Sequence, residues 1–396
     1  MLALSHMAYF SLVVLLVTLV PRAALGEIQY ATNTIFIMGF LGTWRYSWAA
    51  INFARAVVFR RVIHPRRKRL ARRRFAQRAG RSHMYMLVTS YMVEPEVTLP
   101  VYRSVFRAAA RARDGATIVA SVVDGADARL IRQIYETQAE DMTGVQLIVD
   151  RIKANGKRDA LARTLRILGG LSPTHRDILV FVDGDTMVPE DIWTESAPVF
   201  TDLKVGALTT DEDVEVGRES LFKDWFVLRF NQRQVMMCSM GLSKRVLTLT
   251  GRMSVFRADL ATDPTFIQAI GQDFLDHWRL GRVDFLTGDD KSTWFWLLKN
   301  GYEMHYLPDV RSVSFEFQPR PTFLDSSKTL MVRWFGNMIR TNGRALRLSP
   351  RLIGGFTWWS VLDQRVSMWT TLVGPITVAL AAIIVSPSLL PLYIAC

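Results

Sequence analysis

Two carboxylates one residue apart follow an apolar run in the middle of the chain. The run is Ile178–Val182, and the motif after it is Asp183-Gly184-Asp185. The run reads as a buried strand, so both acids are expected at the rim of a sheet. Carboxylate oxygens there suit a hard divalent cation, Mg²⁺ or Mn²⁺, which usually binds one or two carboxylates together with ligand phosphates. The motif therefore predicts a site for a divalent cation and a nucleotide diphosphate.

Other acids follow neighbouring apolar runs. Asp124-Gly125-Ala126-Asp127 comes after Val123, Glu94 follows the first run, and Asp211, Glu212 and Asp213 follow the run that starts at Val205. A single Asp-Gly pair is ordinary turn chemistry, and that alternative stays open for either pair alone. Several strand ends offering carboxylates on one edge favour a binding site.

A basic turn lies between two of these acidic segments. Residues 153–158 read Lys-Ala-Asn-Gly-Lys-Arg and open a helix-like stretch. Glycine lets the backbone turn, and cations at a helix start form an anion site. Lys157 and Arg158 are therefore predicted to contact phosphate, although a solvated basic turn remains the alternative.

Two further motifs carry candidate chemistry. Thr287-Gly288 precedes Asp289 and Asp290, which are either helix caps or a general base reaching an acceptor hydroxyl. Arg333-Trp334 lies in an aromatic and basic stretch. Arg can pair with phosphate and indole can stack on a sugar, and an interfacial anchor pair is the alternative.

The elements that must position these residues alternate from residue 84 to about 323. Short apolar runs are separated by helix-like stretches such as Val101–Arg113 and Arg158–Leu168. This alternation predicts an α/β domain with a mostly parallel sheet covered by helices. Ligands bind beyond the carboxyl ends of the strands in such sheets, which is where the acids fall.

Bilayer-length apolar segments flank this domain. Tyr9–Leu25 and Thr34–Phe59 predict a transmembrane hairpin, with a cleaved signal peptide as the weaker reading of the first. Met368–Val385 is a further candidate, broken by Pro375. The apolar run Leu389–Ala395 is too short to cross a bilayer. We therefore expect either that the chain is truncated relative to its relatives or that this tail lies at the membrane surface.

Charge and cysteine content indicate the surroundings in which the protein acts. The net charge is +13, and residues 28–93 contain no Asp or Glu while eleven Lys and Arg crowd positions 60–81. Beside an apolar segment such a cluster favours a cytoplasmic membrane surface over nucleic acid. Two cysteines exclude a disulfide framework and indicate a reduced, cytoplasmic catalytic domain.

These motifs, in this order and between membrane segments, resemble the processive family 2 glycosyltransferases, which include cellulose, chitin, hyaluronan and alginate (mannuronan) synthases. The resemblance implies a GT-A-type, Rossmann-like mixed sheet with helices on both faces. It also implies two transmembrane helices in 1–60, a basic juxtamembrane segment in 61–81 and a cytoplasmic glycosyltransferase domain in 82–325. Interfacial helices in 326–366 and a final membrane segment in 367–396 complete this organisation.

The resemblance also implies roles for single residues. Asp124 and Asp183 would contact the nucleotide, Asp185 the metal, and Lys157, Arg158 and Arg333 the phosphates. Asp290, beside Asp289, would be the general base, and Trp334 would stack on the acceptor sugar. One position departs from the family: Leu330 stands where a Gln is expected before Arg333-Trp334.

Within the family, three segments are most similar to alginate synthases: residues 248–257, 288–294 and 333–337. This similarity implies GDP-mannuronate as donor, a growing β-linked polysaccharide as acceptor, and a separate co-polymerase or regulatory partner. It further implies a multi-pass protein of the bacterial inner membrane. A hyaluronan-, chitin- or cellulose-like synthase using a UDP-sugar, and a non-catalytic export scaffold, remain the alternatives.

Overall fold

The computed structural model describes residues 32–78, 80–138, 142–277, 281–284, 288–384 and 387–389, with a few residues before position 20. Most of the predicted segments Tyr9–Leu25 and Leu389–Ala395, and Thr287, lie outside these residues. The chain divides into two compact units, one formed by residues 1–51 and 363–396 and the other by residues 52–362.

The first unit contains parts of two long helices, α3 (Thr32–Val58) and α15 (Gly355–Ile384). Within this unit Arg45 lies 3.1 Å from a carboxylate oxygen of Asp363 and donates to the Thr370 hydroxyl. The expected break at Pro375 was wrong, because α15 runs through it; a proline removes one backbone donor while the rest of the ladder continues. Among the helices that the structure describes, none is both long and apolar enough to cross a bilayer.

In the second unit the basic segment is helical. It consists of a short π-helical turn, η1 (Phe59–Ile63), and the helix α4 (His64–Gln77). Its inner face carries ion pairs, since Lys68 lies 2.6 Å from Glu195 and His64 lies 2.8 Å from Asp309. The segment is thus tied to the domain that follows it.

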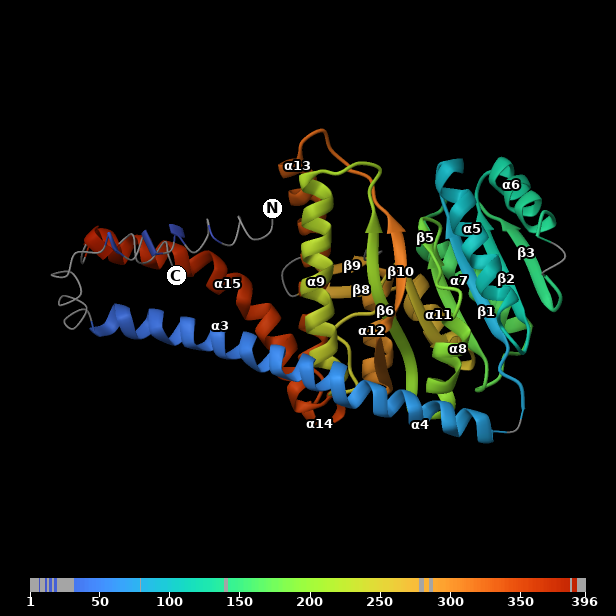
Figure 1. Ribbon diagram of the computed structural model, residues 1–396, viewed down its shortest axis with the longest axis horizontal. Helices are drawn as coiled ribbons and strands as arrows, with labels where there is room; N and C mark the ends of the chain where they lie inside the picture. Colours follow the sequence, from blue (N-terminus) through green and yellow to red (C-terminus); the bar gives the residue numbers. More distant parts are fainter. Residues whose placement is uncertain are drawn as a thin grey trace. The chain divides into compact units, whose positions relative to one another are not determined.

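An eight-stranded sheet forms the centre of this unit, in the order β3-β2-β1-β4-β7-β6-β10-β5 (Figure 1). Strands β1 to β4 are parallel, β7 is antiparallel to both of its neighbours, and β10 is parallel to β6. The strands are β1 (Met84–Ser90), β2 (Ala116–Val122), β3 (Val145–Arg151), β4 (Ile178–Asp183), β5 (Thr186–Met187), β6 (Val205–Glu215), β7 (Met253–Arg257) and β10 (Glu303–Phe315).

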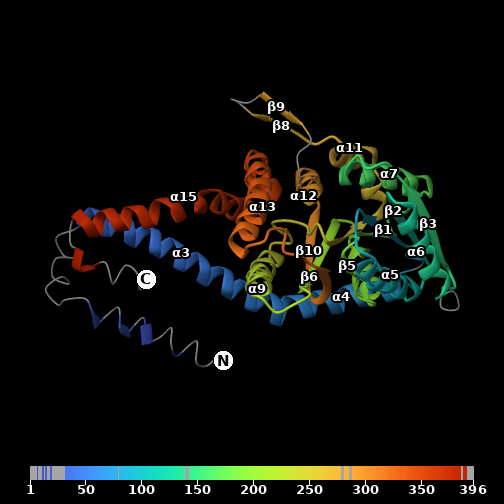
Figure 2. The ribbon, with the colours of Figure 1, turned by 90° about the horizontal axis from the view of Figure 1, so that it is seen from above.

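Helices cover both faces of the sheet, as predicted. Alternate residues of β1 enter different cores: Met86 packs under α5 (Pro95–Ala110) and α6 (Gly125–Glu136), and Leu87 packs under α7 (Lys157–Gly170). Figure 2 shows α5 and α6 on one side of the sheet and α7 and α11 on the other. The face with α5 and α6 is also covered by α8 (Ile192–Ser196) and η3 (Ala197–Thr201). The face with α7 is also covered by α10 (Ala258–Ala261), α11 (Pro264–Gly271), α12 (Asp289–Lys299) and α14 (Pro350–Ile353).

Two features extend this core. A two-stranded hairpin, β8 (Phe274–His277) and β9 (Gly281–Asp284), projects from the sheet domain between α11 and α12 (Figure 2). Helices α9 (Leu221–Gly241) and α13 (Phe323–Ala345) pack together through what we call the aromatic cluster. Its members are Val214, Val216, Phe222, Trp225, Phe226, Phe230, Phe323, Leu330 and Trp334.

The apolar runs that predict strands, such as Ile178–Val182, are all strands in the structure, but β6 is longer than its run. Asp211, Glu212 and Asp213 therefore lie inside the strand, which corrects their expected position beyond its end. Each finds a cation there: Arg311 lies 3.1 Å from Asp211 and 3.5 Å from Asp213, and Glu212 pairs with Arg233. Ion pairing is what lets charged groups occupy a buried strand.

Candidate active site

A small recess at the carboxyl ends of β1 and β4 collects four of the predicted site residues. Its lining consists of Thr89, Lys157, Leu161, Phe181, Val182, Asp183, Thr250, Gly251, Ser254, Phe256, Asp289, Asp290 and Thr293. The structure thus brings together Lys157, Asp183, Asp289 and Asp290 from three separate segments of the sequence.

The Asp183-Gly184-Asp185 turn is held by backbone hydrogen bonds to three other segments. Asp183 N–H donates to the Arg252 carbonyl, Gly184 N–H to that of Thr89, and Asp185 accepts from Phe315 N–H, each at 2.8 Å. A Cβ on Gly184 would lie 2.4 Å from Ser90 Oγ and 2.8 Å from its Cα. Glycine is required because the turn lies against the end of β1.

Lys157 lies at the centre of the carboxylates. Its Nζ is 2.6 Å from Asp183 Oδ1 and 3.3 Å from Asp289 Oδ2, and it donates to the Gly251 carbonyl at 3.3 Å. Burial lowers the pKa of Lys157, but Asp183 and Asp289 outweigh this effect and raise it overall. Burial raises the pKa of Asp183 to about 7; Lys157 opposes the rise, and Asp289 and Asp185 add to it. The recess is therefore rich in negative charge and has one internal cation.

Asp289 and Asp290 form the first turn of α12. Gly288 before them has φ +89°, and a Cβ there would lie 2.9 Å from Asn337 Nδ2, so the entry to the helix requires glycine. The Thr248 hydroxyl lies 3.4 Å from Asp290 Oδ2. Burial and then the Asp289 charge raise the pKa of Asp290, which makes its carboxylate a stronger base.

Lys291 anchors this turn from inside the protein. Its buried Nζ donates to the Leu247 carbonyl at 2.7 Å and lies 4.8 Å from the Trp294 ring, and Trp294 donates to the Val246 carbonyl. Burial lowers the pKa of Lys291 to about 8, although Asp290 opposes the shift. The loop at 246–248 thus holds both the start of α12 and the Asp290 carboxylate.

Asp185 lies beside the recess, at the end of the same turn. One carboxylate oxygen accepts a hydrogen bond from Thr186 at 3.2 Å. Among the residues described, no three His, Cys, Asp or Glu side chains are grouped to bind one metal ion. The Asp183 and Asp185 oxygens are hard donors that fit a cation whose remaining ligands are substrate phosphates.

Two residues that were predicted to contact the nucleotide-sugar donor lie outside the recess. Asp124 is exposed and caps α6, since its carboxylate accepts from Ala126 N–H at 2.8 Å. Arg158 donates to the Ile270 carbonyl at 2.6 Å and to Ser292 Oγ at 2.8 Å. Neither side chain lines the recess in this structure.

Arg333 and Trp334 lie on α13, also apart from the recess. Arg333 is exposed. Trp334 stacks on Trp225 of α9, with ring centroids 5.6 Å apart and planes 6° from parallel. Leu330, one turn earlier, is buried in the aromatic cluster. The position expected to hold Gln is thus an apolar packing position.

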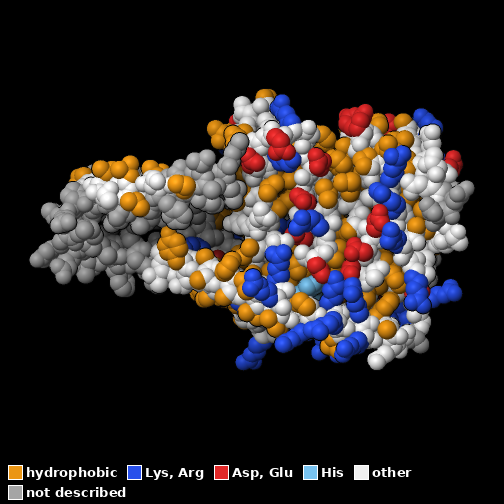
Figure 3. Space-filling model, in the orientation of Figure 1, with side chains coloured by type: hydrophobic (Ala, Val, Ile, Leu, Met, Phe, Trp, Pro, Cys, Tyr) orange, Lys and Arg blue, Asp and Glu red, His pale blue; other side chains and the backbone are white. Residues whose placement is uncertain are grey.

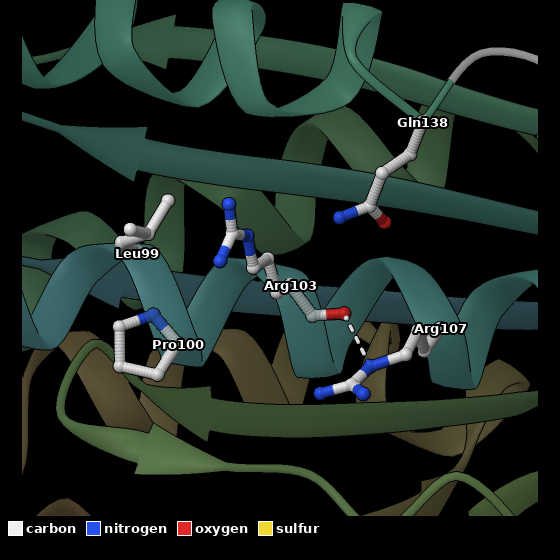
Figure 4. A pocket seen from close by; sticks show the side chains of 5 residues that line it. All are labelled: Leu99, Pro100, Arg103, Arg107 and Gln138. Carbon is white, nitrogen blue, oxygen red and sulfur yellow. Dashed lines mark hydrogen bonds between the residues drawn. The ribbon is translucent and has the colours of Figure 1, made fainter.

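A separate surface hollow carries none of the predicted site residues. It lies over α5 and is lined by Leu99, Pro100, Arg103, Arg107 and Gln138 (Figure 4). The two guanidinium groups are its charged members, and Arg107 donates to the Arg103 carbonyl. The acidic recess is therefore the candidate active site.

Sequence reasoning missed the part of the recess contributed by the loop before β7. Thr250 and Gly251 line it, and a Cβ on Gly251 would lie 3.9 Å from Asp290 Cβ. The available signal was Thr-Gly between two apolar runs, which indicates a turn but not its partners. Its proximity to Asp290 depends on the antiparallel pairing of β7 with β4.

Comparisons with known proteins identify the family and agree with the fold. The family described as "Glycosyltransferase like family 2" matches residues 81–337. The chain is 42% identical to "Glycosyltransferase alg8" of Pseudomonas syringae pv. tomato over 375 residues, covering 94% of this chain and 75% of that protein. It is 41% identical to the Azotobacter vinelandii protein of the same name, covering 87% and 70%.

The chain therefore belongs to glycosyltransferase family 2 and is a glycosyltransferase. Among solved structures, a mannosyltransferase from Pyrobaculum calidifontis, in complex with GDP-Man and Mn²⁺, has the same fold, with a TM-score of 0.52. It is 18% identical, and the match covers 84% of this chain and 87% of that one. The predicted GT-A-type mixed sheet with helices on both faces is confirmed.

Proposed function

We propose that this chain polymerises a GDP-activated uronic acid, GDP-mannuronate, into the β-linked polysaccharide mannuronan, the precursor of alginate. The observation that carries the proposal is the recess, where Asp290 lies beside the Lys157–Asp183 pair at the carboxyl edge of the sheet. The alg8 relatives and the GDP-Man complex of the structural neighbour support the donor class. A UDP-sugar donor is the second candidate, which the family as a whole supports.

In the proposed reaction a hydroxyl at the end of the growing chain attacks the anomeric carbon of the donor. Asp290 accepts the hydroxyl proton, a new carbon–oxygen bond forms, and the bond to the diphosphate breaks on the opposite face. One displacement turns an α-linked donor into a β-linkage. The raised pKa of Asp290 suits this step, because a carboxylate with a higher pKa is a stronger base than an ordinary Asp.

Negative charge accumulates on the leaving diphosphate. A divalent cation held by Asp185, with Asp183 nearby, would offset that charge; the structural neighbour, solved with Mn²⁺, supports such a requirement. Lys157 supplies a second positive charge once the donor phosphates displace it from Asp183 and Asp289. Asp124 would contact the nucleoside, and Arg333 and Trp334 the phosphates and acceptor after movement of α13.

We also propose that the protein acts at the inner face of a bacterial inner membrane. The apolar segments at both ends and the basic α4 support this location. A co-polymerase or regulatory subunit is proposed on family resemblance alone, and the growing polymer would pass from the active site to the membrane.

The Asp290→Asn substitution tests the mechanism. It removes the base but keeps the shape, so we expect transfer to fall at least about a thousandfold. Binding of GDP should stay within about twofold, since Asp290 is assigned to the acceptor side. Transfer retained in the variant would refute the assignment, and lost GDP binding would place Asp290 in the donor site.

A further inference from the structure

Four polar side chains form a continuous network behind the recess. Arg158 donates to Ser292 Oγ at 2.8 Å, and Ser292 Oγ donates to Asp273 Oδ2 at 2.5 Å. Arg344 NH1 lies 2.9 Å and 3.0 Å from the two oxygens of Asp273. Ser292 and Asp273 are both buried. The network joins the starts of α7 and α12, the segment before the β8–β9 hairpin, and α13.

Its members adjoin the residues assigned to chemistry. Arg158 follows Lys157 in the chain, and Ser292 comes two residues after Asp290. Ser292 also holds the first turn of α12, because its backbone N–H and its hydroxyl each lie 3.3 Å from the Gly288 carbonyl. A shift of Ser292 would therefore move the turn that presents Asp289 and Asp290.

The guanidinium of Arg158 donates hydrogen bonds within this network and to a nearby backbone carbonyl. Besides Ser292 it donates to the Ile270 carbonyl at 2.6 Å, and Arg158 is not among the residues that line the acidic recess. On the far side, the Arg344 guanidinium lies 4.2 Å from the Phe295 ring of α12. Buried networks of this kind are strong when each member is satisfied and costly when one is removed.

We propose that Arg158 is a positioning residue that fixes Asp290 relative to Lys157, through Ser292 and Asp273, and does not bind the donor phosphates. The inference rests on the proposed function, because it assigns Asp290 the role of base. Donor-side and acceptor-side groups lie on different helices, α7 and α12. A fixed distance between those helices is what a single displacement needs, since misplacement of a reacting group by about 1 Å can cost a hundredfold in rate.

The two roles predict opposite kinetic changes for Arg158→Met in the full chain. A positioning role lowers kcat about tenfold to a hundredfold and leaves KM for GDP-mannuronate and Kd for GDP within about twofold. A phosphate contact weakens GDP binding about tenfold or more and makes the loss salt-dependent. Arg163→Met is the matched control, because Arg163 lies on the exposed face of α7 and pairs with Asp150.

Ser292 provides an independent test, since it does not line the recess. Ser292→Ala should lower kcat as Arg158→Met does, Ser292→Thr should restore much of it, and the double variant should lose no more than the worse single. The pH dependence of kcat should shift in both single variants, which a loss of stability alone would not produce.

Three outcomes overturn the inference: a rise in Kd for GDP with unchanged kcat, additive losses in the double variant, or unchanged kinetics in both. Wild-type protein that transfers from no GDP-sugar counts against the proposed donor instead. The same variants are then compared with the UDP-sugar that it does use.

Discussion

At the scale of single residues, Lys157 and three carboxylates share one small volume. Lys157 contacts Asp183 and Asp289 directly, and Asp290 follows in the same helical turn. Burial is the main cause of the raised pKa values of Asp183 and Asp290, and the neighbouring Asp289 carboxylate adds to both. A ligand that brings a divalent cation would relieve this repulsion.

The raised pKa of Asp290 predicts the pH dependence of catalysis. A base is active when deprotonated, so kcat should fall as the pH drops through this pKa, above the range of an ordinary Asp near 3.9. A profile of kcat against pH at saturating donor measures this acid limb. A limb at the ordinary value would show that Asp290 is not the group being titrated.

Gly184 predicts a sharp steric effect. Gly184→Ala places a methyl group against Ser90 and should destabilise the fold by about 1–3 kcal/mol or more, because both strands are fixed by the sheet. Urea unfolding measures the change, with Gly217→Ala as control, since nothing lies within 4 Å of the corresponding Cβ. Equal stability of the two variants would contradict the close approach of the turn to β1.

The sequence identified the residues that meet in the recess, but it did not predict the partners of every candidate side chain. Asp183, Lys157, Asp289 and Asp290 meet because the carboxyl ends of parallel strands share an edge, which periodicity reveals. Arg158 could not be placed, because its partners Ile270 and Ser292 lie more than a hundred residues away. Asp124 was identified as a strand-end acid, and its capping of α6 is the turn chemistry weighed against binding.

At the scale of elements, the aromatic cluster joins α9 to α13. Trp334 stacks on Trp225 and meets Phe226 edge-on at 5.8 Å. Leu330→Gln would restore the family's usual residue but bury an amide among these rings. We expect the free energy of unfolding to fall by about 1–3 kcal/mol, since the surrounding apolar side chains offer the amide no hydrogen-bond partner.

Thermal or urea unfolding measures the effect, and Leu330→Met serves as the apolar control. If Leu330→Gln is as stable as wild type and raises activity, then α13 adopts another position during catalysis. That result would place residue 330 at the substrate.

Apolar runs in the sequence predicted β1 to β4 but not every strand of the sheet. The runs that became β1 to β4 are apolar because helices cover both faces. Strand β10 was not predicted, because polar residues such as Arg311 and Ser312 leave it without a continuous apolar run. Its pairing with β6, including Arg311 opposite Asp211, depends on contacts a hundred residues apart.

At the scale of the whole molecule, basic residues are most concentrated on α4 and in the segments beside it, at positions 60–81. Figure 3 shows Lys and Arg side chains gathered along the edge of the molecule that α4 forms. Arg66, Arg69, Arg73 and Arg74 are exposed there. Replacing these four with Gln should reduce binding to vesicles containing anionic lipid, by about 1 kcal/mol for each charge near the surface at low salt.

Sedimentation with phosphatidylglycerol vesicles measures this effect, and neutral phosphatidylcholine vesicles are the control. The difference between wild type and variant should shrink at high ionic strength, because salt screens exposed charges. A variant that binds both vesicle types as wild type does would contradict a lipid-facing role for α4.

Transfer of mannuronate at the acidic recess is the central proposal for this protein. Membranes containing the full chain are incubated with labelled GDP-mannuronate or with labelled UDP-sugars, and the linkage of any polymer is determined. We expect incorporation from GDP-mannuronate into a β-linked polymer, dependent on a divalent cation and absent in Asp290→Asn. Polymer formed only from a UDP-sugar, or equal incorporation by the Asp290→Asn variant, would contradict the account.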